Sequence, residues 1–258
     1  IGSAFAAARG HTGLIPYLTA GYPAPDVTLE MLRALSRAGS LALEIGIPFS
    51  DPIADGPDIQ RASERALARG VGASQALELV ARFRAEDPLR VVIMTYVQPV
   101  LAAGIERFTQ AAARAGVDGV LISDLPPEEA PEVWEHLDRA GLDSVTMVAP
   151  TTDSARLPLL VERCRGFVYC VSRTGVTGAG SGFSGSLAER VAEVRRLTPL
   201  PVAVGFGIST PADAAALRGV ADAAVVGAAF MRAVAQDLEA GAPARARDLA
   251  ERLIAALQ

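Results

Sequence analysis

The chain has 258 residues, of which 50% are hydrophobic and 21% are charged, so it carries enough apolar material for a sizeable core. Its formal net charge is -5, and acidic and basic residues are interspersed, so we expect neither a nucleic acid nor an anionic membrane as a partner. It contains no apolar run of about 18 residues, and its start lacks the layout of a signal peptide, which predicts a cytoplasmic protein without a membrane span.

Short apolar segments alternate with amphipathic segments along the whole chain. The apolar segments are rich in β-branched residues and predict eight strands, at 13–19, 41–46, 90–96, 118–123, 143–149, 166–172, 201–207 and 221–227. The segments between them predict helices at 27–37, 59–69, 74–84, 105–115, 127–139, 155–163, 187–196, 212–217 and 244–257. Several of these helices end in Ala-Gly just before the next strand, where a left-handed glycine stops a helix.

This alternation predicts an α/β fold of the (β/α)8 type, a TIM barrel, with an extra helix after the second strand. An open doubly wound sheet is the alternative. No linker-like shift in composition and no block of charge interrupts the pattern, so we expect a single domain over residues 1–258.

Missing residue types narrow the chemistry. The chain has no Lys and no Asn, and its histidines are His11 and His136, which are far apart in the sequence. Schiff-base chemistry needs a lysine amine and is therefore excluded, and a histidine-clustered metal site is not expected. Cys164 and Cys170 are interpreted as buried core thiols rather than as a disulfide or a metal site. Carboxylates or tyrosines are thus left to transfer protons.

A glutamate stands inside the second predicted strand. Side chains of a strand alternate between its two faces, so Leu43, Ile45 and Ile47 share one face and Glu44 lies on the other. The apolar face should pack against the helices, which predicts that Glu44 points into the barrel near its open end. Desolvation there would raise its pKa toward the range in which a carboxyl group can both give and take a proton. The alternative is a glutamate that reaches solvent at the strand end.

The loop after this strand carries three more carboxylates. Asp51 and Asp55 lie in a Pro/Gly-rich segment, where turn formation and helix capping are the simplest roles. Asp55 differs because the loop can fold over the barrel mouth and bring its carboxylate close to Glu44. Asp58 is placed in a first helical turn, where the helix dipole favours a negative charge.

Glycine-rich segments follow the last three strands. Glycines let a backbone approach a ligand closely, and the loops after strands seven and eight are the usual phosphate site of this fold. Ordinary turn chemistry is the alternative.

Gly180, Gly182 and Gly185 match a dinucleotide fingerprint, but they do not directly follow the strand. The loop after strand six is therefore interpreted as a mobile lid. Tyr169, on that strand, is either a core residue or a hydroxyl in the barrel interior.

Five motifs in order resemble the family of tryptophan synthase α subunits over nearly the whole chain. They are LEIGIPFSDPIADGPDIQ from Leu43, MTYVQPVL from Met94, DLPPEE from Asp124, FVYCVSRTGVTGA from Phe167 and VGFGIS from Val204. The resemblance implies a (β/α)8 lyase that cleaves indole-3-glycerol phosphate to indole and glyceraldehyde 3-phosphate. It also implies a β subunit as partner in an α2β2 assembly, with pyridoxal phosphate in that partner and no cofactor in this chain.

The resemblance also implies roles for individual residues. The catalytic residues would be Glu44, Asp55 and Tyr169. Contacts to the β subunit would come from Pro48 and Asp51. The substrate and its phosphate would be held by Thr177, Gly178, Phe206, Gly207, Gly227 and Ala228.

Two residues depart from the pattern of the family. Gln98 stands where the family often has Asn, and Ala228 stands where it commonly has Ser, which removes one hydroxyl contact to phosphate. Three other functions stay open at this point: a stand-alone lyase that releases free indole, a non-catalytic subunit that activates a partner, and another phosphosugar enzyme such as an isomerase.

Overall fold

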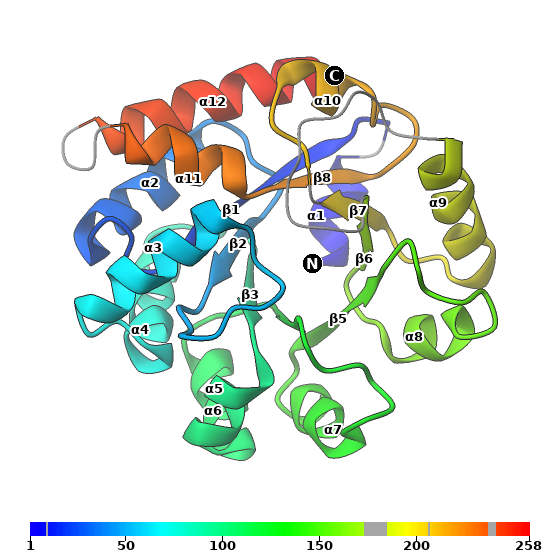
Figure 1. The fold of residues 1–258 in the computed structure, drawn as a ribbon, viewed down its shortest axis with the longest axis horizontal. Coiled ribbons are helices and arrows are strands. Elements are labelled where there is room, and N and C mark those ends of the chain that lie inside the picture. Colours follow the sequence, from blue (N-terminus) through cyan, green and yellow to red (C-terminus); the bar gives the residue numbers. More distant parts are fainter. Residues whose placement is uncertain (9, 173–184, 206, 237–240) are drawn as a thin grey trace.

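A computed structural model describes residues 1–8, 10–172, 185–205, 207–236 and 241–258. Its centre is a closed barrel in which each strand pairs in parallel with the next and β8 pairs with β1 (Figure 1). The strands are β1 (Gly13–Thr19), β2 (Leu43–Gly46), β3 (Val91–Thr95), β4 (Gly119–Ile122), β5 (Asp143–Val148), β6 (Val168–Val171), β7 (Val202–Gly205) and β8 (Ala223–Val226). The predicted (β/α)8 barrel is confirmed, and the open sheet is excluded because the strand order closes on itself.

Helices surround this barrel as an outer ring (Figure 1). They are α1 (Gly2–Ala7), α2 (Pro25–Arg37), α3 (Pro57–Ala68), α4 (Ala73–Arg84), α5 (Val97–Ala103), α6 (Ile105–Arg114), α7 (Pro131–Arg139), α8 (Leu157–Arg163), α9 (Gly185–Leu197), α10 (Pro211–Ala215), α11 (Ala228–Ala235) and α12 (Ala242–Leu257). None of the described helices is long and apolar enough to cross a membrane.

The predicted helices are all present, with shifts of a few residues at their ends. The largest shift is in α7, which begins at Pro131 rather than at Pro127, because the chain first forms a turn in which the Glu129 N–H donates to the Pro126 carbonyl. Three further helices are not predicted by the sequence pattern. They are α1, α5 and α11, which are short, and α11 follows its strand directly, so no polar turn marks its start.

The glycines that were predicted to stop helices do so. Gly39, Gly116 and Gly141 adopt φ values of +91°, +82° and +72°, in the left-handed region that favours glycine. Cys164 and Cys170 are free and buried, as predicted. In the part of the chain that the structure describes, no group of three or more His, Cys, Asp or Glu side chains could hold a metal ion.

Side chains of the strands divide into two apolar layers. Leu43, Ile45 and Ile47 belong to the layer between the barrel and the helices. Other side chains, among them Ile15 and Val92, fill the barrel interior. The prediction for the two faces of β2 is therefore confirmed.

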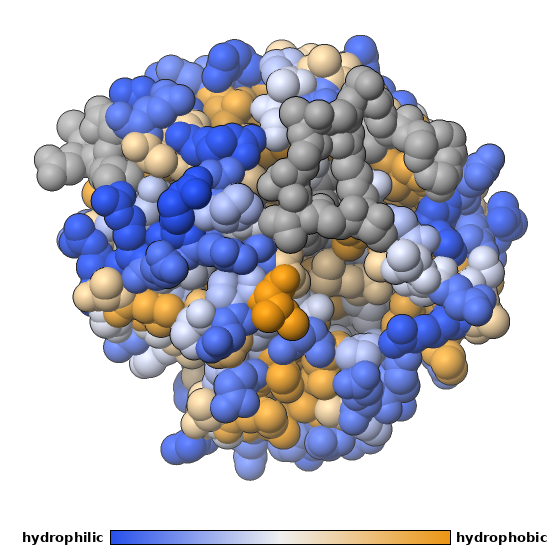
Figure 2. All heavy atoms as spheres, in the orientation of Figure 1, coloured by the Kyte–Doolittle hydropathy of each residue, from blue (hydrophilic) through white to orange (hydrophobic). Residues whose placement is uncertain are grey.

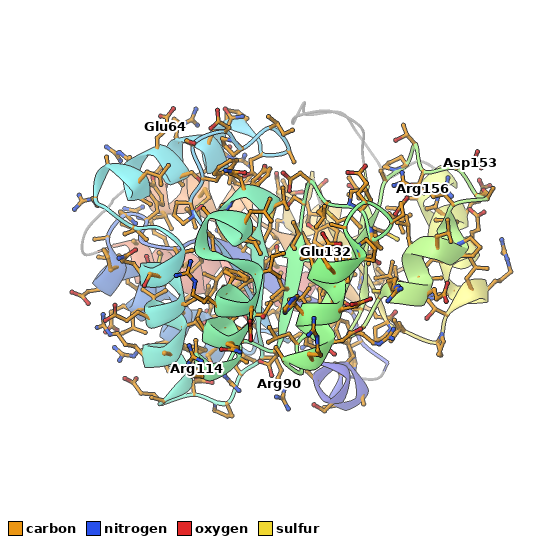
Figure 3. The ribbon with its side chains drawn as sticks, turned by 90° about the horizontal axis from the view of Figure 1, so that it is seen from below. Glu64, Arg90, Arg114, Glu132, Asp153 and Arg156 are labelled. Carbon is orange, nitrogen blue, oxygen red and sulfur yellow. The ribbon has the colours of Figure 1, made fainter. Side chains whose placement is uncertain are left out.

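Figure 3 shows the barrel from the side, with Arg90 near one rim and Asp153 and Arg156 near the other. Since Arg90 precedes β3 and the other two residues follow β5, the second rim is the one at which the strands end.

Two tyrosine rings of the interior each lie over a glycine of the following strand. A Cβ atom on Gly46 would lie 2.0 Å from the Tyr17 hydroxyl, and a Cβ atom on Gly205 would lie 1.9 Å from the Tyr169 hydroxyl. These glycines are therefore required by packing, since each leaves room in the barrel for a phenol. Both hydroxyls are thereby placed near the rim at which the strands end.

Candidate active site

A pocket at the carboxyl ends of the strands collects most of the predicted site residues. It is lined by Tyr17, Glu44, Asp55, Gly56, Ile59, Met94, Tyr169, Gly207, Ile208, Ser209, Val225, Gly227 and Ala228. A wider hollow lies at the opposite rim, beside α1 and α9. Its carboxylates are already used, since Asp222 pairs with Arg195 and Asp143 pairs with the amino group of Ile1. The first pocket holds Glu44 and Asp55, each with a carboxylate oxygen that has no hydrogen-bond partner among the described residues, and it is therefore the candidate active site.

Glu44 lies in the barrel interior on β2, beside Tyr17 of β1 and Val92 of β3. Its exposed fraction is 2%, which excludes a glutamate that reaches solvent. Among the described residues its Oε1 atom has no hydrogen-bond partner. Burial, and secondarily the charge of Asp55, raises the pKa of Glu44 to about 8. At neutral pH this carboxyl group is therefore mostly protonated and can donate a proton.

Asp55 reaches the same pocket from the loop after β2. Its exposed fraction is 3%, and its backbone is fixed by hydrogen bonds from its N–H to the Pro52 carbonyl and from Gln60 Nε2 to its own carbonyl. Burial raises the pKa of Asp55 to about 6, while a hydrogen bond donated by the Tyr96 hydroxyl opposes this shift. Its Oδ1 atom has no partner within the described part of the chain. Asp55 is therefore mostly ionised at neutral pH.

Tyr96 holds the Asp55 loop and was not assigned a role from the sequence. Its hydroxyl accepts a hydrogen bond from the Ala54 N–H at 3.0 Å, and its ring contacts Phe49 with 5.2 Å between centroids. Alternation from Val92 through Met94 along β3 would have indicated that Tyr96 faces the interior. Its contact with a loop 42 positions earlier could not be read from that alternation.

Tyr169 lies in the interior of the barrel, where it belongs to the inner apolar layer and also reaches the pocket, so its two interpretations are compatible. Its ring is 4% exposed and lines the pocket. Burial, followed by the charges of Glu44 and Asp55, raises the pKa of Tyr169 well above its usual value. Tyr169 is therefore a neutral hydroxyl at all ordinary pH values. Tyr17, to which the sequence assigns no role, lines the same pocket.

The far side of the pocket is built by the loop after β7 and the start of α11. Gly207 has a φ of +78°, and Gly227 precedes the first residue of α11, Ala228. The first N–H groups of a helix have no partner within that helix and favour an anion. Thr177, Gly178 and Phe206 lie outside the described residues, as do Gly180 and Gly182 of the dinucleotide-like motif. Gly185 of that motif begins α9.

Asp58 forms a polar cluster next to this wall. Arg232 of α11 donates to Asp58 Oδ2 at 2.7 Å and to the Ser209 hydroxyl at 2.9 Å, and Arg61 also pairs with Asp58. The predicted place of Asp58 in the first turn of α3 is confirmed, and the carboxylate additionally connects α3 with α11.

The segment expected to face a partner is partly buried. Pro48 is buried within this chain, whereas Asp51 is exposed and accepts a hydrogen bond from the Ser50 hydroxyl at 2.5 Å. Ile53 is 79% exposed, which is high for a large apolar side chain. On the face shown in Figure 2, apolar side chains lie around the centre, and hydrophilic side chains predominate toward the outer edge of this face. Gln98, in α5, is exposed as well.

Comparisons with known proteins agree on one family. Residues 4–256 match the model of the family described as tryptophan synthase alpha chain. The chain is 46% identical to the tryptophan synthase alpha chain of Chromobacterium violaceum, over 100% of this chain and 97% of that one. It is 49% identical to that of Laribacter hongkongensis, over 97% and 94%.

Solved structures give the same result. A structure of Mycobacterium tuberculosis tryptophan synthase matches with a TM-score of 0.91 and 37% identity, over 99% of this chain and 97% of that chain. The tryptophan synthase subunit alpha of Legionella pneumophila matches with a TM-score of 0.87 and 35% identity, over 99% and 97%.

Proposed function

Because the chain belongs to the tryptophan synthase alpha chain family, we propose that Glu44 and Asp55 are the residues that carry out its reaction. The protein is a carbon–carbon lyase that cleaves indole-3-glycerol phosphate to indole and glyceraldehyde 3-phosphate in tryptophan biosynthesis. One observation carries the residue assignment: two buried carboxylates with raised pKa values, each with an oxygen that has no partner among the described residues, share one pocket.

The cleavage needs two proton transfers and an electron sink. Glu44 protonates C3 of the indole ring, and the carboxylate that results then takes the proton from the hydroxyl on the adjacent side-chain carbon. The bond between that carbon and C3 breaks, its electrons return to the ring, and the hydroxyl becomes the aldehyde. Asp55 faces the indole N–H, on which positive charge develops. Glu44 ends the cycle protonated, so all atoms balance and each positioned transfer contributes about 10²- to 10⁴-fold.

The wall opposite the carboxylates supports a phosphate site. We assign the phosphate to the backbone of Gly207, in the loop after β7, and to that of Gly227 and Ala228 at the start of α11. Ala228 has no hydroxyl, so binding there rests on its N–H. The family resemblance adds Thr177, Gly178 and Phe206, and Tyr169 is assigned as a neutral hydroxyl beside the reacting carboxylates.

We expect a bell-shaped dependence of kcat/KM on pH, with one limb at about pH 6 and the other at about pH 8. Asp55 must be ionised to face a developing positive charge, so activity should rise as pH rises through about 6. Glu44 must hold a proton to start the reaction, so activity should fall as pH rises through about 8. Steady-state rates from pH 5 to 9 measure both limbs. A profile that keeps rising from pH 8 to pH 9 would contradict the role of Glu44 as the starting acid.

The partner of the family is a tryptophan synthase β subunit, and we propose an α2β2 assembly with pyridoxal phosphate in the β subunit and no cofactor in this chain. Asp51, Pro48 and the exposed Ile53 form the proposed contact segment, with Pro48 shaping the loop from within. Residues 1–258 are proposed to act as one domain. Two free buried cysteines suit the reducing cytoplasm, which is the proposed location.

Replacing Ile53 with Asp is expected to weaken binding to a β subunit by about 10-fold or more, because an exposed apolar anchor is lost and a charge is buried. Titration calorimetry with a purified β subunit measures the Kd. The matched control is Leu159→Asp on α8, since Leu159 is also an exposed apolar side chain, at 53%. Equal Kd values for the Ile53 variant and the unchanged chain would exclude this segment from the interface.

The decisive experiment supplies indole-3-glycerol phosphate to the purified chain and measures glyceraldehyde 3-phosphate, with and without a β subunit. We expect slow formation by the chain alone and faster formation in the complex. Strong activity that a β subunit does not raise would instead indicate a stand-alone lyase. Absence of product in both conditions would overturn the proposed function and indicate a non-catalytic subunit.

A further inference from the structure

Tyr17 occupies a place in the pocket that its packing alone does not explain. It lies on β1 opposite Glu44, it is 4% exposed, and its hydroxyl is 3.2 Å from Thr19 Oγ1. Gly46, two positions after Glu44 on the same face of β2, leaves open the space that this hydroxyl fills. The Tyr17 hydroxyl therefore stands where a side chain next to Glu44 would otherwise project.

The ring of Tyr17 also lies against the proposed phosphate site. A Cβ atom on Gly227 would lie 3.2 Å from Tyr17 Cδ1, so the ring packs directly on that part of the backbone. A substrate whose phosphate is held at Gly227 and whose reacting atoms lie at Glu44 must extend along Tyr17. The part of the substrate between those two ends is its glycerol chain, which carries the hydroxyl that loses its proton.

We propose that the Tyr17 hydroxyl is a further catalytic group, which donates a hydrogen bond to the substrate oxygen that becomes the aldehyde while Glu44 removes the proton from that oxygen. This inference rests on the proposed function. Thr19 is a positioning residue: when its Oγ1 donates to the Tyr17 oxygen, the Tyr17 proton is free to point into the pocket. No proton leaves Tyr17, so the proton balance of the cleavage is unchanged.

A neutral donor is suited to this task. Burial, with the charges of Asp55 and Glu44, raises the pKa of Tyr17 well above its usual value, so the hydroxyl keeps its proton across the working pH range. The substrate oxygen gains negative charge as its proton departs, and a donor fixed in advance stabilises that charge without reorganisation.

The test compares Tyr17→Phe with the unchanged protein, both in complex with a β subunit. We expect kcat to fall by about 30- to 100-fold, because a donor to a developing oxyanion is lost, while KM changes by less than about threefold. Thr19→Val should lower kcat by a smaller factor, and Thr19→Ser should restore it. The matched control is Tyr22→Phe, which removes the hydroxyl of a buried tyrosine in the outer apolar layer and should leave kcat unchanged.

A second measurement separates this role from a structural one. An analogue that joins indole to phosphate through a chain without hydroxyls should bind Tyr17→Phe and the unchanged protein with equal Kd in calorimetry. A kcat for Tyr17→Phe within twofold of the unchanged protein, or an analogue Kd that rises as much as kcat falls, overturns the inference and leaves the proposed function standing. Absence of product from the unchanged protein overturns both.

Discussion

Replacing Glu44 with Gln is expected to lower the rate of indole release by at least about 10³-fold, because the amide can neither protonate C3 nor accept the hydroxyl proton. The barrel should stay folded. Gln has nearly the shape of Glu, and the buried Oε1 has no partner to lose among the described residues. Single-turnover measurement of glyceraldehyde 3-phosphate, with a thermal unfolding curve of the same sample, gives both quantities.

The control for this substitution is Glu64→Gln, which makes the same chemical change on the exposed surface of α3 (Figure 3). We expect it to leave the rate unchanged. If Glu44→Gln kept more than a tenth of the activity with a normal unfolding curve, the proton transfers would have to be assigned to another group, and Tyr169 would be the next candidate because it lines the same pocket.

The barrel itself could be predicted because its signals are local. Alternation along β2 is enough to place Glu44 in the interior, and glycines such as Gly116 mark the helix ends. Local signals fail where chain segments lack turn residues. In the segment from β8 into α11, apolar residues continue through Gly227 and Ala228 without a polar break, so the short helix is invisible in the sequence.

The site could be predicted less completely because its other half depends on distant contacts. The resemblance implies roles for Glu44 and Asp55, but not for the hydroxyl of Tyr96 that holds Asp55 in the pocket. The packing of the Tyr17 hydroxyl on Gly46 depends on the register between β1 and β2, and that register is set by the closed barrel. Sequence indicates which residue types can do the chemistry, whereas their separation, burial and pKa values follow from the tertiary fold.

The two carboxylates therefore have different tasks in one pocket, and their environments separate them. Glu44 is the more strongly desolvated, since no hydrogen bond from the described residues to its Oε1 offsets its burial, and its pKa rises to about 8. Asp55 receives the Tyr96 hydrogen bond, and its pKa rises to about 6. A pair whose pKa values are pushed apart in this way can hold one proton at neutral pH, on Glu44, and one negative charge, on Asp55.

Replacing Asp55 with Asn tests this division. We expect kcat/KM to fall by about 10²- to 10³-fold, because a neutral amide cannot stabilise positive charge on the indole N–H as a carboxylate does. The remaining activity should lose its acid limb near pH 6. Its alkaline limb should move below pH 8, since the charge of Asp55 is one of the causes that raise the pKa of Glu44.

Stability should change in the opposite direction to activity in Asp55→Asn. The folded pKa of Asp55 lies above its usual value, so its contribution to stability is complete at low pH and is lost as pH rises through about 6. Above that pH the unchanged protein holds a buried charge that the variant lacks, and we expect the variant to unfold at an equal or higher temperature at pH 7.5. Asp51→Asn, on the exposed part of the same loop, is the matched control. Measured on the chain without a β subunit, it should change neither the pH profile nor the unfolding temperature. An Asp55→Asn enzyme that kept both limbs of the profile would show that the acid limb belongs to another group and would overturn the assignment of the charge to Asp55.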